Sequence, residues 1–387
     1  MKSVLILLST PTFEDFYEKG LGFSLAEYVS SYRGDYSWYY AMELRRLGHD
    51  VSIGCFSIKY EGVFHTDDGV DIILFRPSPF VKIVNPFRKI VRGKILRYVF
   101  EIFWAMGFFR SVNSIVSTRK IEIIYVQEYW RPRFDILALL LGARVIGADH
   151  GGRYTDNLIF FKRWLFKRAK ALTSQTSDEL KKVSKITDNA VLIPNGVDTD
   201  YFRPDPSRIS DDEFNLIVTV CRLNDDQKRI SDLIKAISQL DTTWKLRIIG
   251  SGPDEAMLKS LVTSIGITDR VEFFGFISDK AMIREQYLSC KIFALVSSRE
   301  GLPYVVLEAM SCGTVCLLSD IRAHRELVDD GRSGFLVPVN DVQGIVRAII
   351  RSSTLQLSDI RSAARAKIVE NYSTVRRMKE LSELIER

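Results

Sequence analysis

The sequence of 387 residues is poor in the residues that form disulfides or bind metals. It has five cysteines and four histidines. The cysteines lack CxxC spacing, and no pair of histidines accompanies them. Neither a disulfide framework nor a zinc site is therefore indicated, and no metal ligand is assigned. Cysteines scattered through apolar segments fit a reducing cytoplasm best.

Long apolar runs are missing as well. The longest, Val4 to Leu8 and Tyr98 to Phe109, are too short or too interrupted by charge for the roughly 20 apolar residues of a membrane span. We expect no transmembrane helix, and we interpret the first run as a buried strand because no small-residue cleavage site follows it. With 46% hydrophobic and 26% charged residues and no tandem repeat, the whole chain should fold into two domains.

Short apolar runs alternate with helical patterns along the chain, which is typical of βαβ units and parallel sheets. The expected strands are Val4–Leu8, Val51–Phe56, Ile72–Phe75, Ile123–Val126, Arg144–Ala148 and Ala171–Thr173 in the first half, and Leu216–Val220, Lys245–Ile249, Val271–Phe274, Ile292–Val296, Val315–Leu318 and Gly334–Val337 in the second. We predict an α/β protein of two doubly wound, Rossmann-like domains, with ligands bound in a cleft between the carboxyl ends of their strands.

Proline and glycine clusters at Pro194–Asp198 and Pro204–Pro206 interrupt this periodicity and indicate a linker. We place the first domain at residues 1–204 and the second at residues 205–370. The helical, charged segment 371–387 either packs on its own domain or crosses back to the first.

The strongest functional pattern lies between Ile292 and Met310. A helix is expected to begin near Pro303, and its free N–H groups around Gly301 would carry the positive end of the helix dipole, which suits a diphosphate. Glu300 and Glu308 would lie along one wall of the cleft, where carboxylates accept hydrogen bonds from the hydroxyls of a sugar or ribose. Taken alone, two such glutamates are more often a helix cap and a solvated helix residue.

Two cations follow the first strand of the second domain, Arg222 at its end and Lys228 at the next helix start. They can converge on a diphosphate and neutralise a leaving group, although loop cations are usually solvated. After the next strand, Gly250 and Gly252 invite a dinucleotide-binding interpretation. Because Glu255 holds the place of the third glycine, we reject a nicotinamide site.

His150 ends an expected strand of the first domain, just before two glycines. A lone histidine is more often structural than catalytic, but a strand end that faces the cleft favours a role in the site.

The run from Glu300 to Met310 resembles the E-x7-E motif of the family 4 retaining glycosyltransferases (glycosyl transferases group 1), which have the GT-B fold. The resemblance implies that Glu308 holds the ribose of the donor nucleotide, while Glu300 and the loop after it face the donor sugar and phosphates. These loop residues are Gly301, Leu302 and Pro303. The resemblance also implies that residues 1–204 form the acceptor-side domain and residues 205–370 the nucleotide-sugar-binding domain.

Other residues resemble the same family one by one. Arg222 and Lys228 match its diphosphate-binding pair, and His150 matches a strand-end histidine that contacts the donor sugar. The nucleotide pocket is matched by Gly250, Gly252, Phe276 and Ile277, and the interdomain signature by Pro194–Asp198. The chain departs from the family's Gly-Gly pair after the first strand, offering Gly20-Leu21-Gly22 and then Gly34, of which Gly34 is assigned to the donor side.

The resemblance implies transfer of a sugar from a nucleoside diphosphate sugar to an acceptor hydroxyl, with retention and without an enzyme nucleophile, in polysaccharide, lipopolysaccharide or glycolipid assembly. Since Arg222, Lys228 and the Glu300 loop would stabilise the leaving diphosphate, no metal or other cofactor is expected. A GT-B-like epimerase, a phosphorylase and a non-catalytic sugar-nucleotide-binding subunit remain alternatives.

Residues 80–110 form a basic, aromatic segment with no acid before Glu101. Its six cations are Lys82, Arg88, Lys89, Arg92, Lys94 and Arg97. Such a segment is typical of an interfacial helix on anionic lipid, or of a helix packed on the sheet with its basic face in water. The acceptor is expected to be a glycan or a lipid-linked molecule, and docking would favour the lipid-linked one and place the protein at the inner face of the cell membrane. No nucleic-acid motif accompanies the charge, so nucleic acid is not expected as a partner.

Overall fold

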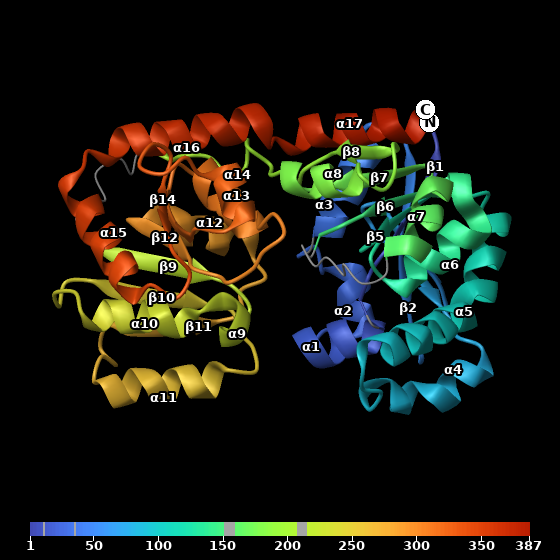
Figure 1. The fold of residues 1–387 in the computed structure, drawn as a ribbon, viewed down its shortest axis with the longest axis horizontal. Helices are drawn as coiled ribbons and strands as arrows, with labels where there is room; N and C mark the ends of the chain where they lie inside the picture. The colour runs from blue at the N-terminus through green and yellow to red at the C-terminus, as the bar shows by residue number, and fades with distance from the viewer. Residues whose placement is uncertain (11, 35, 151–158, 207–214) are drawn as a thin grey trace. The chain divides into compact units, whose positions relative to one another are not determined.

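The computed structural model describes residues 1–10, 12–34, 36–150, 159–206 and 215–387. Two compact units are present, one comprising Met1–Pro194 together with Met378–Arg387, the other Asn195–Arg377. Each is an α/β domain built on a single sheet (Figure 1).

The first unit has eight strands in the order β3-β4-β2-β1-β5-β6-β7-β8, all paired in parallel except the edge strand β3. The strands are β1 Ser3–Leu7, β2 Asp50–Phe56, β3 Gly62–Phe64, β4 Asp71–Phe75, β5 Ile123–Gln127, β6 Val145–Ala148, β7 Ala171–Ser174 and β8 Ala190–Leu192. The helices are η1 Glu14–Glu18, α1 Lys19–Leu21, α2 Leu25–Ser30, α3 Tyr36–Arg46, α4 Pro79–Val84, η2 Asn85–Lys89, α5 Lys94–Thr118, α6 Pro132–Leu141, η3 Gly142–Arg144, α7 Ile159–Arg168, α8 Ser177–Val183 and α17 Thr374–Glu386.

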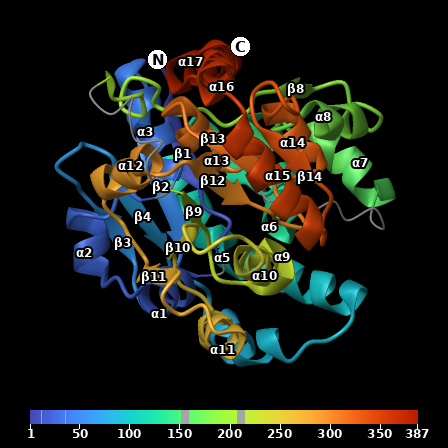
Figure 2. The ribbon, with the colours of Figure 1, turned by 90° about the vertical axis from the view of Figure 1, so that its left-hand side faces the viewer.

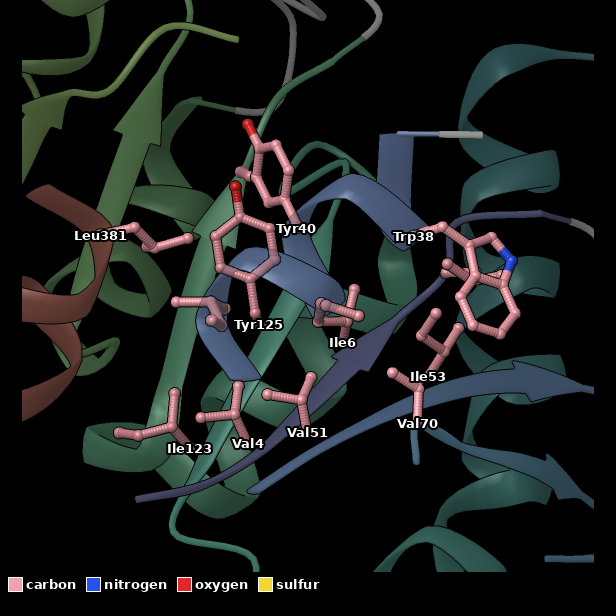
Figure 3. Packing of buried hydrophobic residues seen from close by; sticks show 14 of the residues in the cluster. Val4, Ile6, Trp38, Tyr40, Val51, Ile53, Val70, Ile123, Tyr125 and Leu381 are labelled. Carbon is pink, nitrogen blue, oxygen red and sulfur yellow. The ribbon is translucent and has the colours of Figure 1, made fainter. Parts of the chain in front are cut away.

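Both faces of this sheet are buried, because successive side chains of a strand point to opposite faces. Val4 and Ile6 of β1 enter the cluster covered by α3 and the end of α17, which Figure 3 shows from close by. Leu5 and Leu7 enter the opposite cluster, beneath α5, α6 and α7. Burial on both faces explains why the strands appear in the sequence as nearly continuous apolar runs.

Helix α17 brings the end of the chain to the first unit. Met378, Leu381 and Ile385 are fully buried in the core beneath α3. The carboxylate of Glu386 lies 3.1 Å from the amino group of Met1, and Figure 1 shows the two termini side by side.

The division between the units falls after Pro194 rather than at the expected 204/205 boundary. The intervening residues bond to the second unit: Ser311 Oγ donates to the Phe202 carbonyl at 2.6 Å, and Arg365 donates to the Thr199 carbonyl at 2.8 Å. The proline-rich linker therefore packs as part of the second unit.

The second unit has a six-stranded, all-parallel sheet in the order β11-β10-β9-β12-β13-β14. Its strands are β9 Leu216–Val220, β10 Lys245–Ile249, β11 Val271–Gly275, β12 Ile292–Leu295, β13 Val315–Ser319 and β14 Phe335–Val337. Its helices are α9 Asp225–Lys228, α10 Ile230–Ser238, α11 Glu255–Ile265, α12 Lys280–Ser289, α13 Tyr304–Ser311, α14 Arg322–Leu327, α15 Val342–Thr354 and α16 Leu357–Asn371.

The helices of this unit cover both faces of the sheet. The α10 and α15 helices pack together on one face, with α11 beside α10, as Figure 2 shows. On the other face, α13 packs against both α12 and α16. Strand order and helix placement make this a doubly wound domain, in which the order of strand addition reverses between β9 and β12.

Helix α5 is long and apolar enough, by length and composition alone, to cross a membrane over Ile95–Thr118, which holds for no other helix in the described ranges. Its side chains Trp104, Phe108 and Val112 nevertheless lie in the core cluster of the first unit. A core helix passes the same test, so this property does not by itself make α5 a membrane span.

A buried ion pair joins three helices of the first unit. Nζ of Lys162 on α7 is fully buried and lies 2.7 and 3.0 Å from the carboxylate oxygens of Asp135 on α6. Tyr98 of α5 donates its hydroxyl hydrogen bond to the same carboxylate. Burial lowers the pKa of Lys162 and raises that of Asp135, so each charge depends on the other.

Lys162→Met should lower the free energy of unfolding by about 3–5 kcal/mol, because the Asp135 carboxylate would stay buried without its counter-charge. Urea denaturation followed by tryptophan fluorescence measures this, since four of the five tryptophans lie in the first unit. The matched control is Lys167→Met, an exposed site on the same helix, with an expected loss below about 0.5 kcal/mol. Equal losses in the two variants would contradict the prediction.

Candidate active site

The candidate residues of the second unit stand at one edge of its sheet. Arg222 follows β9, Gly250 follows β10, Phe276 follows β11 and Glu300 follows β12. These four strands are neighbours, and the carboxyl ends of parallel strands share an edge. The loops after them therefore lie beside one another at the reversal between β9 and β12, where ligands of such sheets bind.

Lys228 and Glu300 form an ion pair at the carboxyl ends of these strands. Nζ of Lys228 lies 2.6 Å from Oε1 of Glu300, and the side chains are only 15% and 8% exposed. Little water reaches this pair, so its charges are weakly screened. The structure thus brings together two residues that are 72 positions apart in the chain.

Hydrogen bonds between α9 and the loop after β12 hold this pair in place. Ser298 N donates to the Gln227 carbonyl at 2.7 Å, and Gln227 Nε2 donates to the Arg299 carbonyl at 3.1 Å. Asn224 caps α9 by accepting from Gln227 N. Lys228, the last residue of α9, is therefore fixed relative to the β12 loop before any ligand binds.

The glycines after β10 allow their loop to pack on the backbone that carries Arg222. A Cβ on Gly250 would lie 1.9 Å from the Cys221 carbonyl oxygen, and one on Gly252 would lie 2.3 Å from that of Leu223. Leu223 N also donates to the Ser251 carbonyl at 2.9 Å. These glycines are thus needed because their loop packs closely against the backbone of Cys221 and Leu223. The loop thereby fixes the backbone that carries the exposed Arg222 side chain.

Glu308 lies in the second turn of α13 and is bonded to a tyrosine of α12. Tyr287, almost fully buried, donates its hydroxyl hydrogen bond to Glu308 Oε2 at 2.8 Å. Glu308 is partly exposed, but the surrounding protein raises its pKa to about 7, chiefly by burial, against the lowering effect of Tyr287. The carboxylate is therefore oriented, and it is poised to change charge near neutral pH.

The start of α13 differs slightly from the expectation. The helix begins at Tyr304, and Pro303 occupies the N-cap position. Leu302 is buried, and its carbonyl accepts from Nδ2 of Asn195 at 2.8 Å, while the Tyr304 hydroxyl donates to Asn195 Oδ1 at 3.1 Å. Asn195, which the sequence places in the linker, thus also supports the loop Gly301–Pro303.

The loop after β11 presents an exposed Phe276 and a partly buried Ile277. Gly275 turns the chain here with φ of 73°, and its carbonyl accepts from Gly250 N at 2.8 Å. The two loops assigned to the nucleotide pocket are therefore joined.

His150 belongs to the first unit and follows β6 within a group of aromatic rings. Its ring centroid lies 4.3 Å from that of Tyr36, 5.9 Å from Tyr40 and 6.4 Å from Tyr125. Nδ1 lies 3.5 Å from Nε2 of Gln175, which follows β7. The glycines after His150 fall outside the described residues.

Gly34 lies in the loop before α3, two residues ahead of the Tyr36 that stacks near His150. A Cβ at Gly34 would lie 3.0 Å from the Tyr32 ring. The loop and the histidine are thus connected through α3.

A buried carboxylate near His150 was not predicted from the sequence. Glu179 accepts from Gln175 N at 2.7 Å and from the Tyr129 hydroxyl. Burial, followed by the nearby Asp149, raises the pKa of Glu179 well above its usual range. Its position at a helix start, two residues after Ser177, offered no signal that it would be buried.

Within the described ranges, no group of three or more His, Cys, Asp or Glu side chains is placed to hold a metal ion. The polar groups at the sheet edge are instead suited to an anion and to hydroxyl groups.

Two family models match the chain. "Glycosyltransferase Family 4" matches residues 35–201, and "Glycosyl transferases group 1" matches residues 204–372.

Several curated proteins are related to it. The putative glycosyltransferase EpsD of Bacillus subtilis is 29% identical over 284 residues, or 63% of this chain and 70% of EpsD. The lipopolysaccharide 1,6-galactosyltransferase of Escherichia coli is 29% identical over 122 residues, or 31% of this chain and 34% of that enzyme. Beyond EpsD, this chain spans less than half the length of each curated relative in the comparison.

Solved structures share the fold. Sucrose-phosphate synthase from Thermosynechococcus elongatus gives a TM-score of 0.77 at 16% identity, covering 100% of this chain and 98% of the other. HepE from Anabaena, solved in complex with UDP, gives 0.71 at 17% identity, covering 99% of both chains. The predicted class of two parallel-sheet α/β domains is confirmed, and with the two models matching nearly the whole chain between them, the protein belongs to the family 4 glycosyltransferases of GT-B fold.

Proposed function

We propose that this glycosyltransferase moves a sugar from a nucleoside diphosphate sugar to an acceptor hydroxyl with retention at the anomeric carbon, and that it needs no metal ion. The observation that carries the proposal is the Lys228–Glu300 pair at the reversal of the sheet, with Arg222 on the adjoining loop. Lys228, which Glu300 holds in place, and Arg222 on the adjoining loop can stabilise the charge that develops on a leaving diphosphate.

The other residues have roles consistent with this donor. Glu308, oriented by Tyr287, would accept hydrogen bonds from the ribose hydroxyls. The backbone N–H groups at the start of α13, beside Gly301–Pro303, would donate to the phosphates. The loops with Gly250, Gly252, Phe276 and Ile277 would contact the nucleotide, and His150 and Gly34 the donor sugar.

Retention would follow from attack by the acceptor on the same face that the diphosphate leaves. In this route no side chain acts as nucleophile. The acceptor oxygen bonds to the anomeric carbon as the bond from that carbon to the diphosphate breaks, the hydroxyl proton passes to the departing diphosphate oxygen, and Lys228 and Arg222 hold that leaving group. A diphosphate that keeps both cations remains a weak base and leaves readily without Lewis-acid help.

We further infer that the acceptor is a glycan or a lipid-linked glycan and that the enzyme works in the cytoplasm, at the inner face of the membrane. Relatives named for colanic acid and lipopolysaccharide synthesis support this class of acceptor. HepE structures solved with UDP and UDP-glucose make UDP-sugars the first donors to test.

Thermal-shift measurements of the full chain with UDP-, GDP- and ADP-sugars in EDTA test the donor, because a bound ligand stabilises the folded state by mass action. The donor that binds is then incubated with candidate acceptors, and NMR of the product reports the anomeric configuration. A retained linkage formed in EDTA is expected. An inverted product or a strict metal requirement would refute the mechanism, and nucleotide release without transfer would indicate the epimerase alternative.

A further inference from the structure

An unusual concentration of exposed apolar side chains occupies α4, η2 and the first half of α5. Nine large hydrophobic residues between positions 80 and 106 are 41–74% exposed, out of 25 such residues in the described part of the chain. They are Phe80, Ile83, Phe87, Ile90, Ile95, Leu96, Val99, Phe103 and Met106. We call this set the 80–106 surface. Large exposed apolar patches mark interaction sites.

Helix α5 carries two apolar stripes. The inward stripe includes Trp104 and Phe108, which are fully buried against the sheet. The outward stripe runs through Ile95, Val99, Phe103 and Met106, which are spaced by four, four and three positions and so share one side of the helix. A helix that is apolar on most of its sides needs an apolar environment beyond its own domain.

Exposed cations lie in the same segment of the chain as this stripe. Lys82, Arg92 and Arg97 are exposed, and the sequence adds three further Lys and Arg residues before the first acid, Glu101. Long basic side chains lay their stems along apolar surface and keep their charge in the polar layer. An apolar stripe combined with surplus positive charge fits a partner that has an anionic outer layer and an apolar interior below it.

We propose that the 80–106 surface docks on an anionic phospholipid bilayer, with its apolar side chains inserted below the headgroups and its cations on lipid phosphates. A spanning arrangement is ruled out because the inward stripe is buried in the protein core. A second protein or another copy of this chain would cover the apolar stripe but would leave the cation surplus unexplained. The inference rests on the proposed location at the membrane, and it is independent of the proposed sugar transfer.

The sequence contains another basic, aromatic run, Phe160–Arg168, which could extend such a basic surface. Lys162, Leu165 and Phe166 in it are fully buried, and Lys162 is paired with Asp135. The docking surface is therefore assigned to the 80–106 surface alone.

Vesicle flotation tests the proposal on the full chain. Wild-type protein should float with vesicles of phosphatidylglycerol and phosphatidylcholine at low salt, and at least about tenfold less with phosphatidylcholine alone or at high salt, because salt screens the attraction. Ile95→Ser/Phe103→Ser and Arg92→Glu/Arg97→Glu should each reduce binding to the anionic vesicles by about tenfold or more. The matched control, Met257→Ser/Ile350→Ser, changes two exposed apolar residues of the second unit and should float like wild type.

Failure of the wild type to float, or equal floating of Ile95→Ser/Phe103→Ser and the control, would overturn the proposal. Light scattering adds a second criterion. If the wild type self-associates but does not bind vesicles, and Ile95→Ser/Phe103→Ser abolishes the self-association, this face is a contact between copies of the chain. Thermal shift with the donor sugar nucleotide should be unchanged in both surface variants. Wild-type protein that floats normally but shows no thermal shift with any nucleotide sugar would count against the sugar-transfer proposal alone.

Discussion

Glu308→Gln should weaken binding of the donor nucleotide sugar by about 100-fold, because each hydrogen bond from a ribose hydroxyl to a carboxylate contributes about 1.5–3 kcal/mol. The substitution keeps the size of the side chain and replaces one acceptor oxygen by an amide donor. Calorimetric titration with the nucleotide sugar identified by thermal shift measures the change. A near-isosteric variant is preferable to Ala, which would also remove packing between α12 and α13.

The same carboxylate should make donor binding depend on pH. With its pKa raised to about 7, Glu308 is ionised mainly above pH 7, and the ionised form is the one that accepts hydrogen bonds from both hydroxyls. The ionised fraction falls from about 0.9 at pH 8 to about 0.1 at pH 6, so affinity should drop about tenfold as pH is lowered over this range. A nucleotide sugar is the right probe, since its diphosphate diester does not titrate there.

Three variants separate this effect from other causes. Glu308→Gln should show a flat affinity between pH 6 and pH 8, whereas Glu370→Gln, an exposed glutamate of the same unit, should behave like wild type. Tyr287→Phe removes a hydrogen bond that lowers the pKa of Glu308, so its affinity profile should shift toward higher pH. A wild-type profile that matches that of Glu308→Gln would exclude Glu308 from the nucleotide site.

The regular part of the fold was predictable because its signals are local. All six expected strands of the second unit are present, within one or two residues of their predicted ends. Parallel strands buried on both faces are apolar over their whole length, and proline and glycine mark the turns between them. Short edge strands such as β3, whose residues are only partly buried, lack this signal and were missed.

The supports of the site depend on contacts between distant segments, and no local pattern encodes them. The Tyr287 and Asn195 side chains hold Glu308 and the Leu302 backbone across 21 and 107 positions of sequence, respectively. The return of α17 to the first unit is similar: Leu381 is a core residue only because β5 and α3 lie beneath it (Figure 3). Motif matching located the residues expected to contact the donor, whereas their supports emerged only with the fold.

Lys228→Met should reduce kcat by about 100- to 1000-fold, the loss typical of removing one group that stabilises developing negative charge. The ion pair with Glu300 adds a second consequence. In the variant, the mostly buried Glu300 carboxylate would face the incoming diphosphate without its counter-charge, and this repulsion should also raise KM for the donor. Steady-state kinetics at varied donor concentration separates the two effects.

The double variant Lys228→Met/Glu300→Gln distinguishes a cation that serves the leaving group from one that merely neutralises Glu300. If Lys228 stabilises the departing diphosphate, removing the carboxylate charge should restore the donor KM toward wild type and leave kcat low. Recovery of kcat as well would mean that Lys228 acts only as the partner of Glu300. Lys235→Met, an exposed site on α10, is the matched control and should leave both constants unchanged. If kcat stays low in the double variant, Glu300 serves to hold Lys228 in position until the diphosphate binds and becomes its counter-charge.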